Sequence, residues 1–363
     1  MKRSFLEILA CPDCGSPFEV SVLREEQHRV NEIWEGLLVC GRCVKSHAIV
    51  DGIPRFVPNA PLLFPEFFQK YPEAAKVIPG AGEADFLKVH GKTQERFGME
   101  WMKYPGPLHE DREVFLAETQ IHASDWEGRL VLDGGCGMGR YSRVAHNLGG
   151  TMVALDLSPA LARLQDLAKE SERMHLVQGN LMRPPLRAEI FDIVYSVGVI
   201  HHTPSAKYTF SQLARLVKPK GLLSVWVYGA PGTFQNFKTN PLRSDRQGLK
   251  KFIFLVWLTV WLREKISDAL RVVTVKMPHN LLYSLCCPLA ALGKVPFLQY
   301  FTFSVHPIWR VRLQENFDWL TPPYQSHHTK EELREWFEQN GIEPLKVLPH
   351  GVVPKPGILG KKK

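Results

Sequence analysis

One short segment constrains this chain more than any other: LVLDGGCGMGR at residues 130–140. The apolar residues that begin it have the character of a buried parallel strand. Asp133 ends this run, and Gly135, Gly137 and Gly139 follow at every second position. Glycine adopts positive φ angles and lets backbone amides approach a ligand closely, so a strand can turn sharply into a helix around a bound group. An acid with three alternating glycines is more than a tight turn requires.

Two common nucleotide-binding patterns fail on this segment. The dinucleotide fingerprint G-x-G-x-x-G needs a glycine where Arg140 stands, and no GK[ST] of a P-loop follows. The segment resembles instead the first motif of class I S-adenosylmethionine-dependent methyltransferases, acid-x-G-x-G-x-G after the first strand. This resemblance implies that Asp133 and the three glycines bind S-adenosylmethionine. A strand–helix turn without a ligand is the alternative interpretation.

Strand and helix signals alternate up to residue 228, which favours a parallel sheet with helices on both faces. The second predicted strand, TMVALDL, contains Asp156, which follows Asp133 by 156 − 133 = 23 residues. This separation is close to the roughly 20 residues expected for an acid that binds a ribose across one βαβ unit. We therefore predict that Asp156 accepts the ribose hydroxyl protons; a helix N-cap before Ser158 is the alternative.

The resemblance also implies cofactor contacts at the ends of the neighbouring strands: Leu157, Asn180, Leu181 and Val197. Asn180 departs from the family's pattern, which usually has an aspartate that contacts the adenine amino group. An amide oxygen can still accept that hydrogen bond, so we expect weakened or reoriented adenine binding and not its loss.

Histidines follow the fourth predicted strand, in VGVIHHTPS. His201 and His202 occupy this loop, and small-molecule members of the family have a similar V-x-H-H segment that lines the site. One of them is a candidate general base, since the pKa of histidine lies near neutrality. Positioning of cofactor or substrate without proton transfer is the alternative, because methyl transfer from a sulfonium depends mainly on alignment.

A later segment, FDWLTPPYQSHHT, resembles one that lines the acceptor pocket in relatives. It makes Tyr324, His327 and His328 weak candidates for substrate contacts.

Four of the seven cysteines form two CxxC pairs, Cys11 with Cys14 and Cys40 with Cys43. Two such pairs can place four thiolates tetrahedrally around one Zn²⁺, and a segment this small needs a metal for much of its stability. Unliganded thiols and a redox pair are the alternatives. LEILACPDC and DGIPRFVP resemble Trm112-like zinc domains, whose free-standing members bind and activate methyltransferases. The resemblance implies a structural or partner-facing role for residues 1–58, not catalysis.

Prolines punctuate residues 59–110, which we predict to be a linker with lid helices. Phe97, Trp101 and Tyr104 recur there at near-helical spacing. They indicate either a helix packed on the domain or, by resemblance to small-molecule methyltransferases, a lid over the cofactor. The methyltransferase domain is expected to cover residues 111–363.

The α/β rhythm stops between about residues 230 and 306. Two apolar segments, KKFIFLVWLTVWLREK and HNLLYSLCCPLAALGKVPFL, lie there among basic residues. They predict two helices that cap the active site, or a cap that touches a membrane or binds a lipid-linked substrate. The capping box of Thr329 and Glu332 then starts a closing helix, followed by strands at IEPLKVL and GVVPKPGILG.

The predicted fold is thus α/β. It has a Rossmann-like seven-stranded methyltransferase sheet with helices on both faces, a helical insertion after the fifth strand, and a small N-terminal zinc-ribbon-like β domain.

Composition limits the setting. With 363 residues, 45% hydrophobic and 23% charged, the chain is globular, and its net charge of +8 permits an anionic partner without requiring one. We see no signal peptide and no run of about 18–20 apolar residues. Paired cysteines favour a reducing compartment. We expect a cytoplasmic protein. Peripheral membrane contact through residues 250–300 is the alternative to a cap that only covers the active site, and the oligomeric state is not predicted.

We predict transfer of a methyl group to O, N or C of a small or lipid-linked metabolite, for example in cell-surface glycan or secondary-metabolite biosynthesis. One alternative is an rRNA or tRNA methyltransferase whose zinc ribbon binds RNA. Against it, the sequence has no compact basic stripe interleaved with stacking aromatics outside the apolar insertion. The other alternative is a non-catalytic protein that recruits a partner through its zinc unit.

Overall fold

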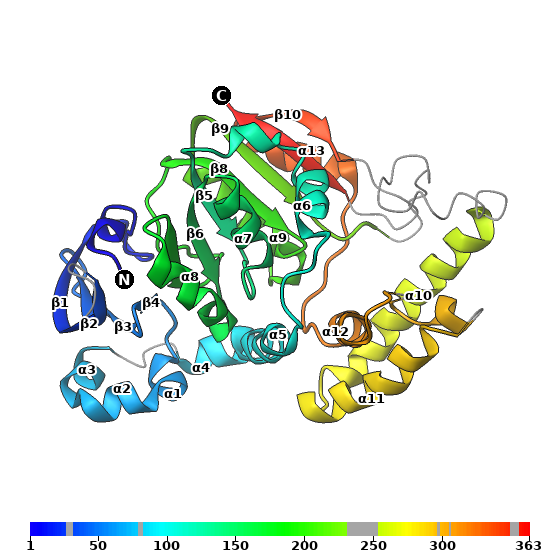
Figure 1. The fold of residues 1–363 in the computed structure, drawn as a ribbon, viewed down its shortest axis with the longest axis horizontal. Helices are drawn as coiled ribbons and strands as arrows, with labels where there is room; N and C mark the ends of the chain where they lie inside the picture. The colour runs from blue at the N-terminus through cyan, green and yellow to red at the C-terminus, as the bar shows by residue number, and fades with distance from the viewer. Residues whose placement is uncertain (27–31, 79–82, 231–252, 296–297, 305, 349–355) are drawn as a thin grey trace.

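The computed structural model describes residues 1–26, 32–78, 83–230, 253–295, 298–304, 306–348 and 356–363. Within these residues one mixed sheet runs through most of the molecule (Figure 1). Its strands are β1 (Phe18–Glu25), β2 (Ile33–Cys40), β3 (Ser46–Val50), β4 (Ile53–Arg55), β5 (Leu130–Gly134), β6 (Thr151–Asp156), β7 (Met174–Gln178), β8 (Phe191–Val197), β9 (Val217–Trp226), β10 (Ile342–Val347) and β11 (Gly357–Lys362). Their order is β1-β2-β3-β4-β7-β6-β5-β8-β9-β11-β10.

The last seven strands of this order form the predicted methyltransferase sheet. Numbered along the chain from β5, they lie in the order 3-2-1-4-5-7-6. The strands β5 to β9 pair in parallel, and β11 is antiparallel to both β9 and β10. The strand order reverses at β5, and ligands of open α/β sheets bind beyond the carboxyl ends of the strands at such a point. The predicted fold class is therefore confirmed.

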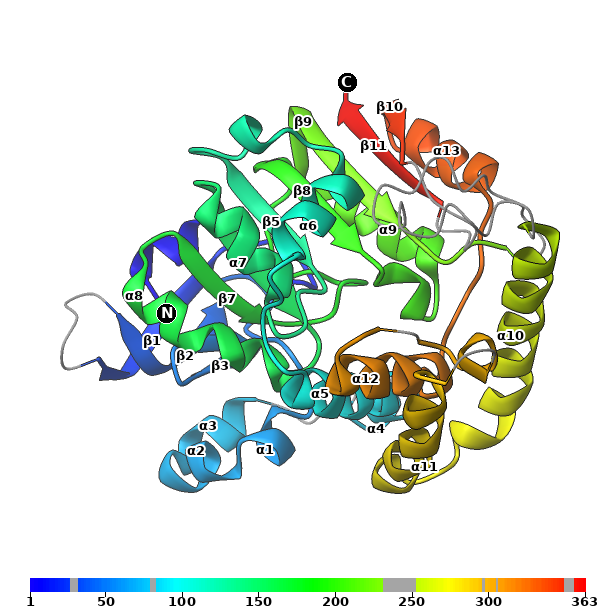
Figure 2. The same cartoon turned by 45° about the vertical axis from the view of Figure 1, so that its right-hand side comes forward.

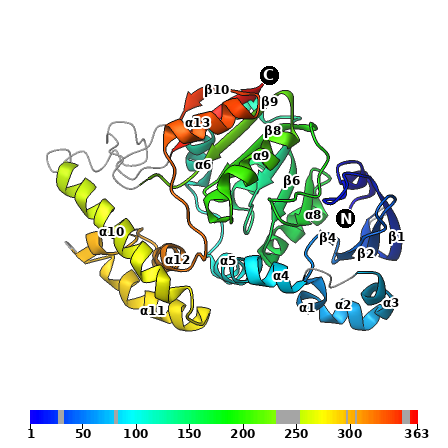
Figure 3. The ribbon, with the colours of Figure 1, turned by 180° about the vertical axis from the view of Figure 1, so that it is seen from behind.

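Both faces of this sheet are buried, which explains why its strands read as continuous apolar runs. Val131 packs with Phe115 on one face, and its neighbour Leu132 packs with Phe210 and Trp336 on the other. The first face carries α6 (Asp111–Thr119), η3 (Ala123–Asp125), α7 (Arg140–Asn147), η4 (Pro159–Leu164) and α8 (Gln165–Glu170). The second carries α9 (Ala206–Leu216), which follows η5 (Ile200–His202), and α13 (Lys330–Gln339) (Figure 3).

The N-terminal unit, residues 1–58, extends the same sheet. It starts with η1 (Arg3–Glu7), and its strand β4 pairs in parallel with β7, where Arg55 lies opposite Gln178. The Phe5 ring stacks on His175 at 4.9 Å, and the Lys2 ammonium donates to the Ala168 carbonyl at 2.7 Å. The sequence predicted a small separate β domain here and did not predict that its sheet continues into the core sheet.

The linker between the unit and the core is helical. It consists of α1 (Ala60–Leu63), α2 (Pro65–Lys70), α3 (Pro72–Val77), α4 (Glu83–Phe86), η2 (Leu87–Gly91) and α5 (Lys92–Lys103). The first four helices pack through Phe67, Phe68 and Phe86 in a cluster with Val50 of β3.

The insertion forms a helical cap at the end of the molecule opposite the N-terminal unit (Figure 2). It contains α10 (Ile253–Thr274), α11 (His279–Leu292), η8 (Leu298–Phe301) and α12 (Trp309–Leu320). The first two helices match the predicted apolar segments. Residues 231–252 and 296–297, at the edges of these segments, lie outside the described part of the chain, and so do residues 349–355 ahead of β11. The sequence did not predict α12. No helix among the described residues is long and apolar enough to cross a membrane.

Candidate active site

The glycine segment forms the loop between β5 and α7. Gly137 has a φ of 55° and Gly139 a φ of 81°, a region that L side chains rarely adopt. A Cβ on Gly139 would lie 2.2 Å from Leu164 Cγ, and one on Gly137 would lie 2.9 Å from the Trp101 ring of α5. The loop therefore needs glycine both for its turn and because neighbouring side chains close over it.

Two acids flank this loop at the ends of β5 and β6. The Asp133 carboxylate accepts a hydrogen bond from Ser142 Oγ at 2.6 Å, and burial raises the pKa of Asp133 to about 7. The Asp156 carboxylate accepts the Gly137 amide at 2.8 Å and, on its other oxygen, the Ser158 amide at 2.8 Å. Asp156 therefore holds the glycine loop, and each of its oxygens has a further lone pair for a ribose hydroxyl.

A polar pair lies at the end of β7. The Asn180 amide Nδ2 is 3.1 Å from His90 Nε2, and Asn180 Oδ1 accepts the Met182 amide at 2.9 Å. Burial lowers the pKa of His90, so its ring is neutral at neutral pH. His90 comes from η2 in the linker, and nothing in its sequence neighbourhood predicted its contact with Asn180.

A cavity of about 540 Å³ lies beyond the carboxyl ends of these strands, within the size range of small-molecule sites. Predicted residues that line it are Asp133, Gly135, Asp156, Leu157, Asn180, Leu181, Val197, His202 and His327. The remaining candidates, Gly137, Gly139, His201, Tyr324 and His328, are not among its lining residues. The aromatic residues of the predicted lid, Phe97, Trp101 and Tyr104, also line it.

The two loop histidines have different surroundings. His202 lies in the cavity wall with Nδ1 at 3.0 Å from the Tyr324 carbonyl, and burial lowers its pKa to about 4. It is therefore neutral at pH 7, with Nδ1 donating to that carbonyl and a lone pair on Nε2. His201 is fully buried behind it and stacks on Tyr228 at 3.9 Å.

The predicted substrate residues Tyr324, His327 and His328 mainly form hydrogen bonds within the protein. His328 Nδ1 lies 2.9 Å from Glu332 Oε1 and its Nε2 lies 2.8 Å from Ser326 Oγ. His327 reaches the cavity, with Nδ1 at 2.9 Å from the Gly229 carbonyl. Tyr324 contributes its backbone carbonyl to His202.

The opposite wall of the cavity, formed by α5 and the cap, was not predicted from the sequence. This wall is built by side chains of α5, α10 and α12: Glu100, Arg263, Glu264, Gln314, Glu315, Asp318 and Trp319. No spacing rule joins these helices, because more than 200 residues of chain, residues 100 to 318, separate the first acid from the last.

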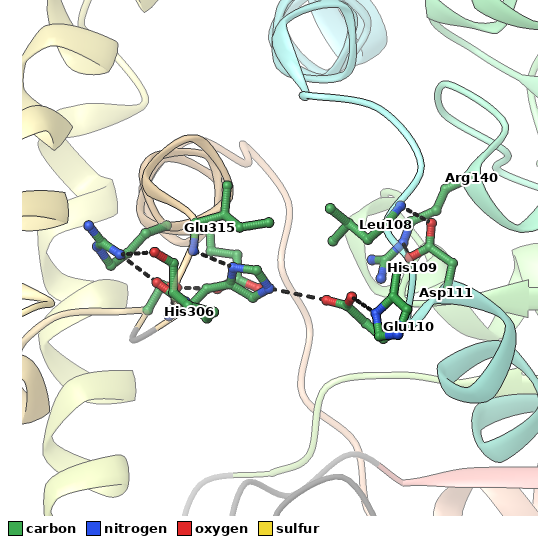
Figure 4. Close-up of polar contacts among 11 residues, drawn as sticks. Leu108, His109, Glu110, Asp111, Arg140, His306 and Glu315 are labelled. Atoms are coloured by element: carbon green, nitrogen blue, oxygen red, sulfur yellow. Dashed lines mark hydrogen bonds and ion pairs between the residues drawn. The ribbon is translucent and has the colours of Figure 1, made fainter.

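An ion pair connects the cap with the core beside the cavity (Figure 4). His306 Nε2, just before α12, lies 3.4 Å from Glu110 Oε1, at the start of α6. The next residue, Asp111, accepts the Leu108 amide at 2.7 Å and the Arg140 guanidinium at 2.5 Å. This chain of contacts joins the cap to the first residue of α7, directly after the glycine loop.

The four paired cysteines lie together in the N-terminal unit, far from the cavity. Their Sγ atoms are all within 4.8 Å of one another; Cys11 to Cys43 measures 3.6 Å and Cys14 to Cys40 measures 3.4 Å. A tetrahedral site with Zn–S bonds of about 2.3 Å has sulfur–sulfur distances of about 3.8 Å. The donor set and its geometry thus fit one zinc ion.

Comparison with known proteins agrees with this geometry. Residues 132–225 match the family model described as a methyltransferase domain. An uncharacterized chloroplastic methyltransferase of Arabidopsis thaliana is 24% identical over 66% of this chain and 67% of its own length. The malonyl-[acyl-carrier protein] O-methyltransferase of Salmonella typhimurium is 34% identical over 26% of this chain and 37% of its own length. The sterol 24-C-methyltransferase of Saccharomyces cerevisiae is 31% identical over 27% of each chain.

The latter two similarities span about a quarter of the chain and well under half of each relative. They therefore say little about parts beyond one domain. The strand order 3-2-1-4-5-7-6, the glycine loop at its reversal point and the matched domain agree with one another. Together they identify residues 132–225 as a class I S-adenosylmethionine-dependent methyltransferase domain.

Proposed function

We propose that this protein transfers a methyl group from S-adenosylmethionine to a small metabolite held between the sheet and the cap. The observation that carries this proposal is a continuous cavity of about 540 Å³, which is lined on one side by Asp133, Asp156 and Asn180 and on the other by α5 and the cap. One compartment therefore has room for a donor above the glycine loop and an acceptor beside it.

The residues of the chain bind and align the reactants. S-adenosylmethionine supplies an electrophilic methyl group on a sulfonium, and an in-line attack needs chiefly orientation. Asp156 binds the ribose, Asn180 the adenine edge, and Trp101 with Phe97 excludes water over the loop. His202, neutral at pH 7, accepts a hydrogen bond at Nε2 and so orients the hydroxyl or amine that is methylated.

The cap decides which acceptor is used. The Salmonella typhimurium and Saccharomyces cerevisiae relatives are named for a malonyl-[acyl-carrier protein] and a sterol as substrates. Each of them resembles this chain over only about 100 residues. The methyltransferase match ends at residue 225, before the cap begins. The shared part accordingly supports donor binding, and the acceptor depends on α5, α10 and α12.

Calorimetric titration with S-adenosylmethionine and S-adenosylhomocysteine tests the proposal. We expect one site per chain for each, and metabolites that gain the mass of one CH₂ group in extracts incubated with protein and donor. Absence of heat with both compounds contradicts the proposal and favours a non-catalytic binding protein. Methyl incorporation into RNA, with none into metabolites, favours the RNA methyltransferase.

The lipid-linked form of the acceptor is supported by one face of α10. Leu262, Ile266, Leu270 and Val273 repeat at helical spacing and are 43%, 51%, 43% and 56% exposed. Lysines at 265, 276 and 294 are the exposed charges of α10, α11 and their connections among the described residues. An apolar stripe beside lysines suits an anionic lipid surface. We expect sedimentation with phosphatidylglycerol vesicles, less with phosphatidylcholine vesicles, and loss of both in Ile266→Glu.

For the cysteine cluster we propose a structural zinc in a Trm112-like domain that serves the covalently joined methyltransferase. The pairing of β4 with β7 supports this, because the edge strand of the core sheet is covered by the unit itself. Elemental analysis should find one zinc per chain; a metal-free, fully folded protein contradicts the assignment.

A further inference from the structure

The cavity is markedly acidic on its cap side. Its lining includes eight carboxylates, two arginines and no lysine among the described residues. Four of the carboxylates come from the cap wall: Glu100 of α5, Glu264 of α10, and Glu315 and Asp318 of α12. The two arginines have other partners. Arg140 pairs with Asp111, and the Arg263 guanidinium lies over the Trp319 ring and donates to the Thr302 carbonyl.

Glu100 is the most buried of these acids. It is 3% exposed, and its Oε2 atom has no hydrogen-bond partner among the described residues. Burial, and then the charges of Asp318 and Glu315, raise the pKa of Glu100 well above its usual value. Gln314, 1% exposed, has an Oε1 atom in the same wall that has no partner within the described part of the chain. Two buried oxygens thus lack donors from the described residues, an arrangement that is costly unless a ligand supplies them.

An aromatic wall adjoins these oxygens. Tyr228 Oη donates to Asp318 Oδ2 at 3.2 Å, and its ring stacks on Trp319 at 5.5 Å, which in turn stacks on Phe303 at 5.7 Å. Aromatic faces attract cations as well as apolar carbon. The histidines in this part of the cavity do not offset the acids, because burial lowers the pKa values of His202 and His327 and His306 faces Glu110.

We propose that the methyl acceptor is an amine, whose ammonium group is bound by Glu100, Asp318 and the Gln314 amide oxygen while its carbon skeleton lies on the Tyr228–Trp319 wall. This inference rests on the proposed function and names its acceptor class. An ammonium group has three donors and no acceptor, so it matches a pocket of acceptor oxygens, whereas a carboxylate or phosphate acceptor would be repelled.

Binding should also release a proton. In the free protein, burial and the acidic neighbours raise the pKa of the Glu100 carboxyl and so favour its protonated form. An ammonium ion beside it favours the carboxylate, so the carboxyl proton passes to the solvent as the ion pair forms. The released proton is measurable. For the transfer, the Glu100 carboxylate would take one proton from the ammonium group. The neutral amine nitrogen would then form the N–CH₃ bond as the S–CH₃ bond of the donor breaks, and S-adenosylhomocysteine would leave.

The test uses the full chain saturated with S-adenosylhomocysteine. Sets of compounds with matched skeletons, beginning with tyramine, tyrosol and 4-hydroxyphenylacetate, are compared by ligand-observed NMR. We expect the amine of a set to bind about tenfold or more tightly than its alcohol and its acid. No excess of amines among the ligands, including no ligand at all, overturns the proposal.

Glu100→Gln and Asp318→Asn test the residues, and Glu95→Gln is the matched control because this α5 side chain is 58% exposed and faces His279. We expect Glu100→Gln to weaken amine binding about tenfold and to abolish proton release, measured by calorimetry in buffers of different ionisation enthalpy. The affinity for S-adenosylhomocysteine and the Tm should stay as in the control.

The two proposals fail separately. If wild-type protein does not bind S-adenosylhomocysteine, the proposed function fails, and the compound sets are run on the free protein to judge the amine site alone. If Glu100→Gln weakens S-adenosylmethionine binding as much as amine binding, the carboxylate serves the donor's own ammonium group. The amine-acceptor proposal is then wrong.

Discussion

Asp156 carries two tasks with one carboxylate. It holds the Gly137 amide and the Ser158 amide, and it presents further lone pairs to the cavity. A charged hydrogen bond is worth about 1.5–3 kcal/mol, so Asp156→Ala should weaken binding of S-adenosylhomocysteine about a hundredfold and Asp156→Asn about tenfold. Calorimetry checks both values, with Asp166→Asn on α8 as a control that should leave the affinity unchanged. Full affinity in Asp156→Ala would falsify the ribose contact.

His202 gives a pH signature. Its pKa is lowered from 6.5 to about 4, mainly by burial, so the unfolded chain binds a proton there that the folded chain does not bind between these values. Its contribution to stability is therefore complete above about pH 6.5 and is lost as the pH falls towards 4. Between pH 7.5 and pH 5 this amounts to about 2 kcal/mol.

Urea unfolding of wild type and His202→Gln at both pH values measures this difference. The wild type should lose about 2 kcal/mol more than the variant on acidification, since the rest of the protein is common to both. Equal losses would show that the imidazole titrates normally in the folded protein.

Helix α5 is the element on which cofactor side and acceptor side depend together. Arg96, 3% exposed, donates to the carbonyls of Thr321 at 2.7 Å, Val275 at 2.7 Å and Met277 at 2.9 Å. One guanidinium thus joins α5 to the ends of α10 and α12. Nearby on α5, Trp101 covers the glycine loop and Glu100 lines the cavity on its cap side.

Arg96→Met should therefore loosen the cap without unfolding the sheet. It leaves several buried carbonyls without donors, a loss of about 3–5 kcal/mol that falls on the cap. Hydrogen exchange should rise in α10 and α12 and stay unchanged in β5 to β8. The exposed Arg112→Met serves as control. Uniform exchange across sheet and cap would contradict a local role of Arg96.

The elements that the sequence predicted are those whose signal is local. Positive φ at Gly137 and Gly139, the acid at the end of β6 and the apolar strands each follow from a few neighbouring residues. Helix α12 was missed because the buried polar residues Arg312, Gln314 and Asn316 alternate with its apolar positions and obscure their helical period.

The cavity wall formed by α5, α10 and α12 could not be predicted for a different reason. Glu100, Glu264 and Asp318 each look like a solvated charge in its own segment, and only tertiary packing buries them around one cavity. The pairing of β4 with β7, which joins the N-terminal unit to the core, also depends on tertiary packing. Arg55 and Gln178 pair across 123 residues of chain, and neither strand signals the partner it selects.

At the scale of the whole molecule, the sheet connects the cysteine cluster with the cofactor loop. Strand β4 pairs with β7, and the Asn59 amide donates to Gln94 Oε1 at 2.7 Å, while Gln94 Nε2 donates to the Leu157 carbonyl at 3.1 Å. Leu157 directly follows Asp156. One hydrophobic cluster contains Cys11 and Leu38 of the unit together with Leu132 and Val177 of the core. We therefore expect a metal bound by the cysteine cluster to stabilise the residues around the glycine loop as well.

Because of this continuity, we expect the unit and the core to unfold together. Structural zinc contributes about 10 kcal/mol or more to the folding of small domains. Cys40→Ser should lower the zinc content, shift the whole calorimetric transition to lower temperature, and weaken S-adenosylhomocysteine binding although no cysteine of the cluster lines the cavity. Cys287→Ser on α11, outside the cluster, is the control and should keep one zinc per chain. The wild type could instead show two separate transitions, of which only the first is sensitive to a chelator. That result would mean that the β4–β7 contact does not couple the two parts and that the N-terminal unit unfolds independently of the core.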